Sequence, residues 1–259
     1  MDLSGRHIVV TGAAGGIGSA LARRFHTAGA RVVLSDLAGS KEVAARLPGS
    51  IGIDADMRNE ASIVALIDAA EAQFGPVDLY FANAGVALGS DPMDDEALWE
   101  VSFDVNVHAH RWAARRLLPG WLDRGEGYFC STASAAGLLA QIGSAPYSVT
   151  KHAAVAFAEW LSITYGERGL KVSCLCPQGV NTNMLNGGDV LGEGGNVVKS
   201  VGVVLEPDVV ADIVHDAIVD EQFLILPHPE VASYMQLKAT DLPRWLAGMR
   251  KLQRRVLGV

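Results

Sequence analysis

Residues 7–18 have the sequence HIVVTGAAGGIG, in which a short apolar run leads into a turn with four glycines. The residues from Gly16 to Ala28 follow a helical pattern. Glycines between a strand and a helix allow a tight turn and close approach to a pyrophosphate, and the helix N-terminus supplies free N–H groups. A glycine-rich turn alone is a weak signal, but this one has the expected strand–turn–helix context.

Short apolar runs alternate with helical patterns along the rest of the chain. Strands are expected at residues 7–10, 31–35, 50–54, 77–82, 127–132, 171–176 and 223–227, and helices at 16–28, 42–47, 59–74, 96–118, 147–166 and 209–219. The strands are almost continuously apolar, which is typical of a parallel sheet buried on both faces. We therefore predict an α/β fold: one Rossmann-like doubly wound domain over residues 1–259, with a seven-stranded parallel sheet flanked by helices.

The composition excludes several classes of protein. The 259 residues are 49% hydrophobic and 19% charged, which is enough apolar material for a core and too much for a disordered chain. The net charge of −8 argues against a nucleic-acid partner. Apolar runs are shorter than the roughly 18 residues of a membrane span, and no signal peptide is evident, so we expect a cytoplasmic protein without an integral membrane segment.

The cysteines and histidines do not predict a metal site. Cys130, Cys174 and Cys176 lie in predicted buried strands, and their odd number does not suggest a disulfide scaffold. Cys174 and Cys176 would share a strand face, but a structural zinc site usually has four ligands. His108 and His110 would face different sides of a helix, and no HExxH motif is present.

Asp36, at the end of the second predicted strand, indicates which dinucleotide the turn would accept. It follows the glycine turn at close to the spacing of about 20 residues at which an acid meets a ribose 2′-hydroxyl. A carboxylate would repel a 2′-phosphate, and neither Ser35, Leu37 nor Gly15 offers a compensating cation. We predict NAD(H) rather than NADP(H). The alternative is a solvated acid at a strand end.

Tyr147 and Lys151 are the candidates for proton transfer. They are four residues apart in a predicted helix and share one face. A nearby ammonium lowers the pKa of a tyrosine, which suits it to acid–base chemistry near neutral pH. Such pairs are common on surfaces, but Ser134 follows the fifth predicted strand, and ligands of open α/β sheets bind at the carboxyl ends of strands. We expect the serine, the tyrosine and the glycine turn to meet in one crevice.

A set of motifs in the expected order resembles the short-chain dehydrogenase/reductase family, in its compact single-domain branch, from about Ser4 to Pro227. The set is TGAAGGIG (11–18), Asp36, Asp56, NAG (83–85), Asn106, Ser134 and YSVTK (147–151). The resemblance implies an NAD-dependent oxidoreductase that transfers a hydride between nicotinamide and a secondary alcohol or ketone. It also implies a homodimer or homotetramer in which long helices pack across a two-fold axis.

The resemblance further implies roles for individual residues. Tyr147 would be the general acid/base, Lys151 would lower its pKa and hold the cofactor ribose, Ser134 would position the substrate oxygen, and Asn106 would hold a proton-relay water. The implied cofactor-binding residues are Gly12, Gly15, Gly16, Ile17, Gly18, Asp36, Leu37, Asp56, Met57, Asn83, Ala84, Gly85, Tyr147, Lys151, Pro177, Gly179, Val180 and Thr182. Among them, Asp56 would contact the adenine amino group and Thr182 the nicotinamide carboxamide.

Two positions depart from the family pattern. Ala82 replaces the usual first asparagine of Asn-Asn-Ala-Gly, which is a common small-residue variant. Gln178 replaces the glycine of Pro-Gly-x-Val-x-Thr, so its amide would point either at the cofactor or substrate, or at solvent. The candidate substrate residues are Val86, Leu138, Gln141, Gln178, Met184 and Leu185. This mostly apolar set favours a hydrophobic substrate.

Two segments outside these motifs also have distinctive sequences. The stretch NGGDVLGEGGN (186–196) predicts either a surface loop or a mobile substrate lid over about 183–203. An amphipathic helical segment is expected over about 229–257, with five cations and no acid between Arg244 and Arg255. It would pack on the body or another subunit, or meet an anionic membrane surface or an acidic substrate tail.

The sequence leaves two alternatives to the dehydrogenase. One is a dinucleotide-binding regulator or structural partner without turnover, which the presence of Asn106, Ser134, Tyr147 and Lys151 disfavours. The other is a carbonyl reductase of acyl thioesters, which Asp36 disfavours because biosynthetic reductases usually use NADPH.

Overall fold

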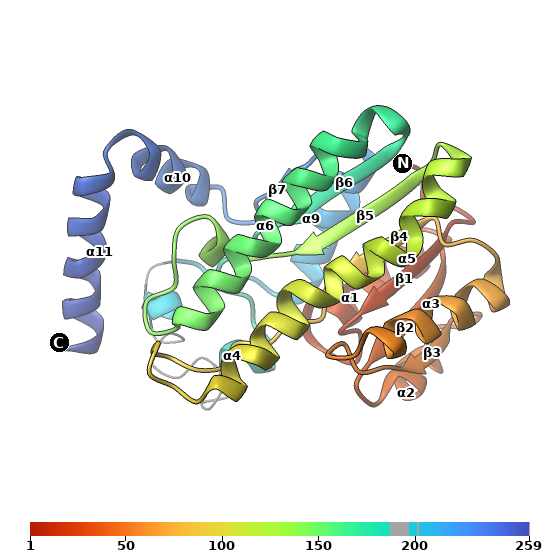
Figure 1. Cartoon of the computed structure of the whole chain (residues 1–259), viewed down its shortest axis with the longest axis horizontal. Coiled ribbons are helices and arrows are strands. Elements are labelled where there is room, and N and C mark those ends of the chain that lie inside the picture. The colour runs from red at the N-terminus through yellow and green to blue at the C-terminus, as the bar shows by residue number, and fades with distance from the viewer. Residues whose placement is uncertain (187–196, 201, 259) are drawn as a thin grey trace.

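A seven-stranded parallel sheet in the order β3-β2-β1-β4-β5-β6-β7 forms the centre of the molecule (Figure 1). The strands of this computed structural model are β1 (His7–Thr11), β2 (Arg31–Asp36), β3 (Ile51–Asp54), β4 (Leu79–Ala82), β5 (Gly127–Thr132), β6 (Leu170–Leu175) and β7 (Leu224–Ile225). The structure describes residues 1–186, 197–200 and 202–258. The predicted doubly wound α/β fold is confirmed, and its strand order reverses between β1 and β4, where such folds bind ligands.

Helices cover both faces of the sheet, which explains the continuous apolar strands. On one face, α1 (Gly16–Thr27) and α9 (Pro207–Val219) pack in a core that includes Ile8 and Val10. On the other face, α3 (Glu60–Phe74), α5 (Ala109–Arg124) and α6 (Ala145–Tyr165) pack in a core that includes Val9. Successive residues of β1 thus enter opposite cores, as the two-residue repeat of a strand requires. The short α2 (Ser40–Ala44) follows β2.

The predicted helix 96–118 differs most from the structure. It is divided into α4 (Glu96–Phe103), a π-helical turn (Asp104–His108) and α5, which continues to Arg124. Such π-turns inside helices are frequent at functional sites. Other boundaries moved by a few residues; for example, the strands predicted at 77–82 and 223–227 are shorter, and the helix predicted at 42–47 occupies 40–44.

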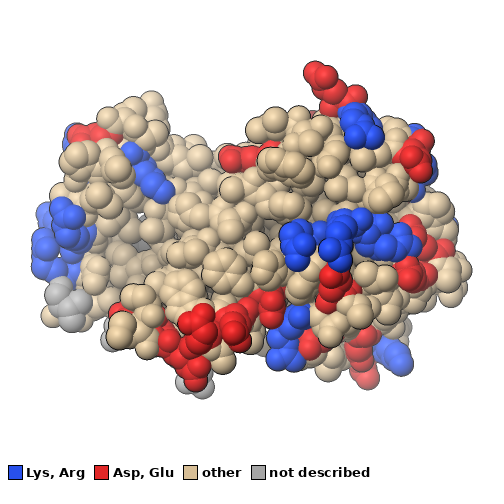
Figure 2. Space-filling model, in the orientation of Figure 1, with Lys and Arg blue, Asp and Glu red and all other residues tan. Residues whose placement is uncertain are grey.

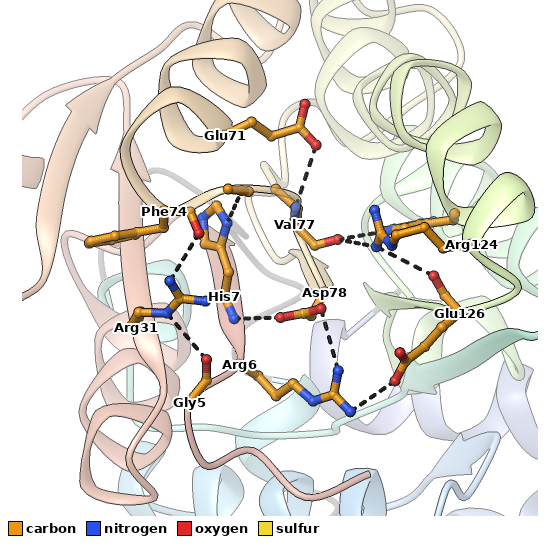
Figure 3. Close-up of polar contacts among 12 residues, drawn as sticks. Gly5, Arg6, His7, Arg31, Glu71, Phe74, Val77, Asp78, Arg124 and Glu126 are labelled. Carbon is orange, nitrogen blue, oxygen red and sulfur yellow. Dashed lines mark hydrogen bonds and ion pairs between the residues drawn. The ribbon is translucent and has the colours of Figure 1, made fainter.

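A polar cluster joins the amino-terminal ends of β1 and β4 at the end of the sheet opposite the strand carboxyl ends (Figure 3). The backbone N–H of His7 donates to Asp78 at 2.8 Å, and the His7 ring nitrogen Nδ1 lies 2.8 Å from the Gly75 carbonyl oxygen. Arg6 forms ion pairs with Asp78 and Glu126. This cluster fixes the strand starts and lies outside the candidate site described below.

The C-terminal segment forms two helices, α10 (Glu230–Thr240) and α11 (Leu242–Leu257), at one edge of the molecule (Figure 1). Asp241 separates them, and its carboxylate accepts the Arg244 N–H at 3.0 Å. Trp245 packs with Val231 and Leu139, while Leu246 stays 45% exposed. The first turn of α11 therefore packs on the body of the same chain through Trp245, and Trp245 is the only buried residue of this helix.

Of the predicted lid, residues 183–186 form the short helix α7 (Asn183–Asn186) and residues 197–200 are helical, whereas 187–196 and 201 lie outside the described residues. No helix within the described residues is both long enough and apolar enough to cross a membrane.

Candidate active site

A cavity of about 540 Å³ lies at the carboxyl ends of the strands. The predicted residues that line it are Gly12, Gly15, Gly16, Ile17, Asp36, Leu37, Asp56, Met57, Asn83, Ala84, Gly85, Val86, Ser134, Gln141, Tyr147, Lys151, Pro177, Gln178, Val180, Thr182, Met184 and Leu185. The predicted residues Gly18, Asn106, Leu138 and Gly179 are not part of this lining. The sheet thus brings motifs from the whole chain into one crevice.

The glycine turn lies between β1 and α1, and its backbone could not accept side chains at two positions. Gly12 has a φ of +64°, and a Cβ there would lie 2.9 Å from the Cα of Ala84. A Cβ on Gly18 would collide with the Gly12 carbonyl oxygen. Gly18 therefore allows α1 to approach the turn, although it does not line the cavity. The turn and the N-terminus of α1 form a cradle that fits a pyrophosphate.

Asp36 ties the glycine turn to the end of β2. Its carboxylate accepts the Ala14 N–H at 2.9 Å and the Leu37 N–H at 2.7 Å. Arg58, which the sequence reasoning missed, lines the same cavity. Its guanidinium binds both oxygens of Asp56 at 2.7–3.1 Å, and this hydrogen bonding lowers the pKa of Asp56. The only sequence signal for Arg58 was its position two residues after Asp56.

The NAG loop after β4 is held by threonine hydroxyls. Thr11 Oγ1 accepts the N–H groups of Asn83 and Ala84, each at 3.0 Å. Thr132 Oγ1 donates to Asn83 Oδ1 at 3.1 Å. These bonds connect the carboxyl ends of β1, β4 and β5 and so hold the cofactor side of the cavity in place.

Ser134, Tyr147 and Lys151 converge in the cavity. Ser134 follows β5, and its hydroxyl hydrogen-bonds the Tyr147 hydroxyl and accepts the Ala136 N–H at 3.1 Å. Lys151 Nζ lies 5.6 Å from the centre of the Tyr147 ring and donates to the Thr132 carbonyl at 2.9 Å. Tyr147 is 9% exposed and Lys151 is 2% exposed.

Burial dominates the protonation of this pair. It lowers the pKa of Lys151 to about 8, and it raises the pKa of Tyr147, against which the hydrogen bond with Ser134 acts. In the cofactor-free protein the pKa of Tyr147 is therefore raised, and a lowering by Lys151 stays a prediction. The physical reason is that the phenol is desolvated, while the ammonium binds the Thr132 carbonyl.

Asn106 lies in the π-helical turn and is fully buried. Its amide accepts the Val86 N–H and donates to the Val86 carbonyl, both at 2.9 Å, and donates to Thr150 Oγ1 at 3.0 Å. A Cβ on Gly85 would lie 3.2 Å from Lys151 Nζ and 3.3 Å from Asn106 Oδ1, so both side chains approach the same glycine.

Part of the cavity lining is apolar. Val86, Met184 and Leu185 line the cavity as predicted, and Val101, Val105, Ala136 and Val198 were missed. Val101 and Val105 are four residues apart just before Asn106, a spacing that could have indicated them.

Leu138, predicted as a substrate residue, instead packs in the cluster that contains Trp245 and Met249. The side chain of Gln178 is part of the cavity lining, and its Oε1 is buried without a hydrogen-bond partner in the described part of the chain.

The three cysteines are free and buried. The sulfurs of Cys174 and Cys176 lie 3.8 Å apart, so the two side chains share a strand face as expected. Across residues 1–186, 197–200 and 202–258, the structure contains no group of three or more side chains that could hold a metal ion.

Comparisons with known proteins agree with this arrangement. The sequence model of the short chain dehydrogenase family matches residues 6–188. The 1-deoxy-11-beta-hydroxypentalenate dehydrogenase of Streptomyces avermitilis is 34% identical over 95% of this chain and 93% of its own. The 17-beta-hydroxysteroid dehydrogenase 13 of Rattus norvegicus is 32% identical over 91% of this chain and 78% of its own.

A crystal structure of a short chain dehydrogenase/reductase from Burkholderia phymatum in complex with NAD superimposes with a TM-score of 0.85. It is 29% identical and covers 94% of this chain and 96% of its own. The fold and the site define a dinucleotide-dependent oxidoreductase acting on CH–OH groups. The chain belongs to the short-chain dehydrogenase family, as its motifs predict.

Proposed function

We propose that this protein is an NAD(H)-dependent oxidoreductase of hydrophobic secondary alcohols and the corresponding ketones. The observation that carries the proposal is a single cavity with Asp36 and the glycine turn at one end and Ser134 and Tyr147 at an apolar other end. The relatives named above are dehydrogenases of a hydroxypentalenate and of a hydroxysteroid, which supports a hydrophobic alcohol.

The residues of the cradle fit a nicotinamide dinucleotide. The glycine turn and the N-terminus of α1 would hold the pyrophosphate, and Asp36 would accept a hydrogen bond from the adenosine ribose. Asp56 and Met57 would face the adenine, Lys151 the second ribose, and the loop from Pro177 to Thr182 the nicotinamide. The bound cofactor supplies the hydride donor or acceptor.

Tyr147 is the proposed general acid/base. Its buried phenol stays protonated in the cofactor-free protein, and it would give its proton to a ketone oxygen or take one from an alcohol. Ser134 would hydrogen-bond the substrate oxygen beside it. Lys151 would stabilise the phenolate with its positive charge. Asn106, which approaches Gly85 together with Lys151, would hold the water that relays the proton to solvent.

The first test is the binding of NADH and NADPH to the purified protein, followed by turnover of a panel of hydrophobic secondary alcohols. We expect a preference for NADH, turnover of at least one alcohol, and loss of turnover in Tyr147→Phe with NADH binding retained. A preference for NADPH would contradict the assignment of Asp36. Wild-type turnover by Tyr147→Phe would remove the mechanism, and NADH binding without turnover of any alcohol would favour a regulator.

We further propose that α4 and α5 pair with the same helices of a second copy around a two-fold axis, as a homodimer or as part of a homotetramer. Acidic side chains gather over α4 and basic ones over α5 (Figure 2). The exposed acids of α4 include Glu96 and Glu100, and the exposed cations of α5 include Arg111 and Arg115. Antiparallel pairing would place the acidic half of each copy against the basic half of the other. Light scattering after size-exclusion chromatography tests this, and Arg111→Glu should shift the equilibrium toward monomer.

The three free thiols are consistent with the cytoplasmic location expected from the sequence.

A further inference from the structure

His228, a buried histidine after β7, hydrogen-bonds two segments that come from different parts of the chain. The side chain is 2% exposed. Its Nδ1 accepts the backbone N–H of Gln178 at 3.1 Å. Its Nε2 lies 3.1 Å from the carbonyl oxygens of both Gly179 and Val203.

These partners determine the tautomer of the ring. A backbone N–H can only donate, so Nδ1 must be the unprotonated nitrogen. Nε2 therefore carries the hydrogen and donates to the two carbonyls. A neutral imidazole provides an acceptor on one side and a donor on the other, which the loop at Gln178–Gly179 requires.

The loop that His228 holds is anchored to the candidate site at both of its ends. At its start, the Pro177 carbonyl accepts the Ala135 N–H at 2.9 Å and the Ser134 hydroxyl at 3.5 Å. At its end, the Thr182 methyl lies 3.1 Å from the position of a Cβ on Gly16. The loop thus spans from the substrate serine to the glycine turn, and His228 holds its middle.

The same histidine joins this loop to the segment that returns from the predicted lid. Leu205 donates its N–H to the Gly179 carbonyl at 2.9 Å, and Asn181 donates to the Leu205 carbonyl at 2.8 Å. The Val203 carbonyl binds His228 directly. Gly202 lies against the Gln178 side chain, because a Cβ there would be 3.1 Å from Gln178 Oε1.

We propose that His228 is a positioning residue that sets the place of the Gln178–Gly179 backbone and the direction of the Gln178 side chain in the cavity. The ring of His228 fixes the backbone of this loop. This explains why the loop can carry glutamine at the position where the family usually has glycine. The inference rests on the proposed function insofar as this loop faces the nicotinamide end of a bound cofactor.

The experiment combines hydrogen–deuterium exchange of the ligand-free protein with NADH affinity measured by fluorescence. His228→Leu removes both the acceptor and the donor. We expect faster exchange in peptides covering residues 176–182 and 203–206, and about tenfold weaker NADH binding, since buried backbone groups lose their partners.

His7→Leu is the matched control. His7 is also buried and also hydrogen-bonds a loop carbonyl, but it lies at the opposite end of the sheet (Figure 3). We expect it to lower thermal stability while leaving exchange at 176–182 and the NADH dissociation constant within about twofold of wild type. This separates positioning from a general loss of stability.

Two conservative variants keep the test informative if His228→Leu does not fold. His228→Asn places Oδ1 near the position of Nδ1 and should restore much of the protection and NADH affinity. His228→Gln keeps a donor near Nε2, and it should protect 203–206 more than 176–182.

Unchanged exchange at 176–182 and unchanged NADH affinity in a folded His228→Leu or His228→Gln would overturn the proposal. Failure of the wild type to bind NADH or NADPH would instead overturn the proposed function, while the exchange of the ligand-free protein would still test His228.

Discussion

At the scale of the residue, burial decides the charge states in the candidate site more than pairing does. Lys151 and Tyr147 are both shielded from water, and their pKa values move in the directions that favour their neutral forms. The hydrogen bond from Lys151 to the Thr132 carbonyl keeps the ammonium within the site despite this burial. In the proposed mechanism the neutral phenol acts as an acid, and the phenolate it leaves would need the nearby charge of Lys151.

Replacement of Lys151 by methionine should therefore stabilise the fold and impair turnover. Burial lowers the pKa of Lys151 from 10.5 to about 8, so the ammonium destabilises the folded state below pH 8. This penalty fades as the pH rises from 8 toward 10.5, because the lysine then loses its proton in the unfolded state as well. We expect Lys151→Met to raise the free energy of unfolding by roughly 1–3 kcal/mol at pH 7 and less at pH 10, with turnover reduced about 100-fold or more. Urea unfolding at both pH values checks this, and equal or lower stability at pH 7 would contradict it.

Asp36 is expected to determine the preference for NADH over NADPH. The Ala14 and Leu37 N–H groups bind different oxygens of Asp36, so Asp36→Asn keeps an acceptor for only one of them, and it removes the charge that would repel a 2′-phosphate. The ratio of NADPH to NADH affinity should rise about tenfold, with a loss of stability of about 1 kcal/mol. Titration with both cofactors measures the ratio. Asp54→Asn, at the end of β3 and outside the cavity lining, should leave it unchanged, and an unchanged ratio in Asp36→Asn would show that the carboxylate does not select the cofactor.

At the scale of the element, the β1–turn–α1 unit shows why two glycines three residues apart, Gly15 and Gly18, are not equivalent. A Cβ at Gly18 would collide with the Gly12 carbonyl, whereas a Cβ at Gly15 would meet nothing within 4 Å. Gly18→Ala should push α1 away from the turn, lower the free energy of unfolding by about 2 kcal/mol or more, and weaken NADH binding. Gly15→Ala should change stability by less than about 0.5 kcal/mol. Equal stability of the two variants in thermal unfolding would contradict this account of the turn.

Some of these elements could be predicted from the sequence and others could not. The strands were predictable because burial on both faces makes them continuously apolar, and the glycine turn was predictable because its neighbours are local in sequence. The π-helical turn was not predictable from the local sequence, and its Asn106 bonds the backbone of Val86, which only the folded chain brings close. The bonds of His228 to Gln178 join residues fifty positions apart. Leu138 packs against residues of α10 and α11, which lie about a hundred positions later in the chain. Its surroundings could therefore not be predicted from the sequence next to it.

At the scale of the whole molecule, the C-terminal helices influence the site through the loop after β5. Trp245 of α11 packs with Ala135 and Leu139, directly after Ser134, and Lys238 of α10 donates to the Leu138 carbonyl at 2.7 Å. The loop that follows Ser134 is therefore held from both sides, by the Pro177 carbonyl and by these two helices. The basic residues of α11 lie at one edge of a chain whose net charge is negative (Figure 2).

Trp245→Ala should release α11 from the body and loosen this loop. The side chain is 9% exposed, so its removal should cost roughly 3 kcal/mol of docking free energy. We expect faster hydrogen exchange in residues 242–257 and 135–141 and a raised KM for hydrophobic alcohols. NADH affinity should stay near that of wild type, because the glycine turn and Asp36 lie far from α11 in the fold. Leu246→Ala is the matched control, since this neighbour is 45% exposed and should change none of these quantities. If exchange in 135–141 is unchanged while α11 itself exchanges freely, the helix does not hold the substrate loop, and its role lies in contacts outside this chain.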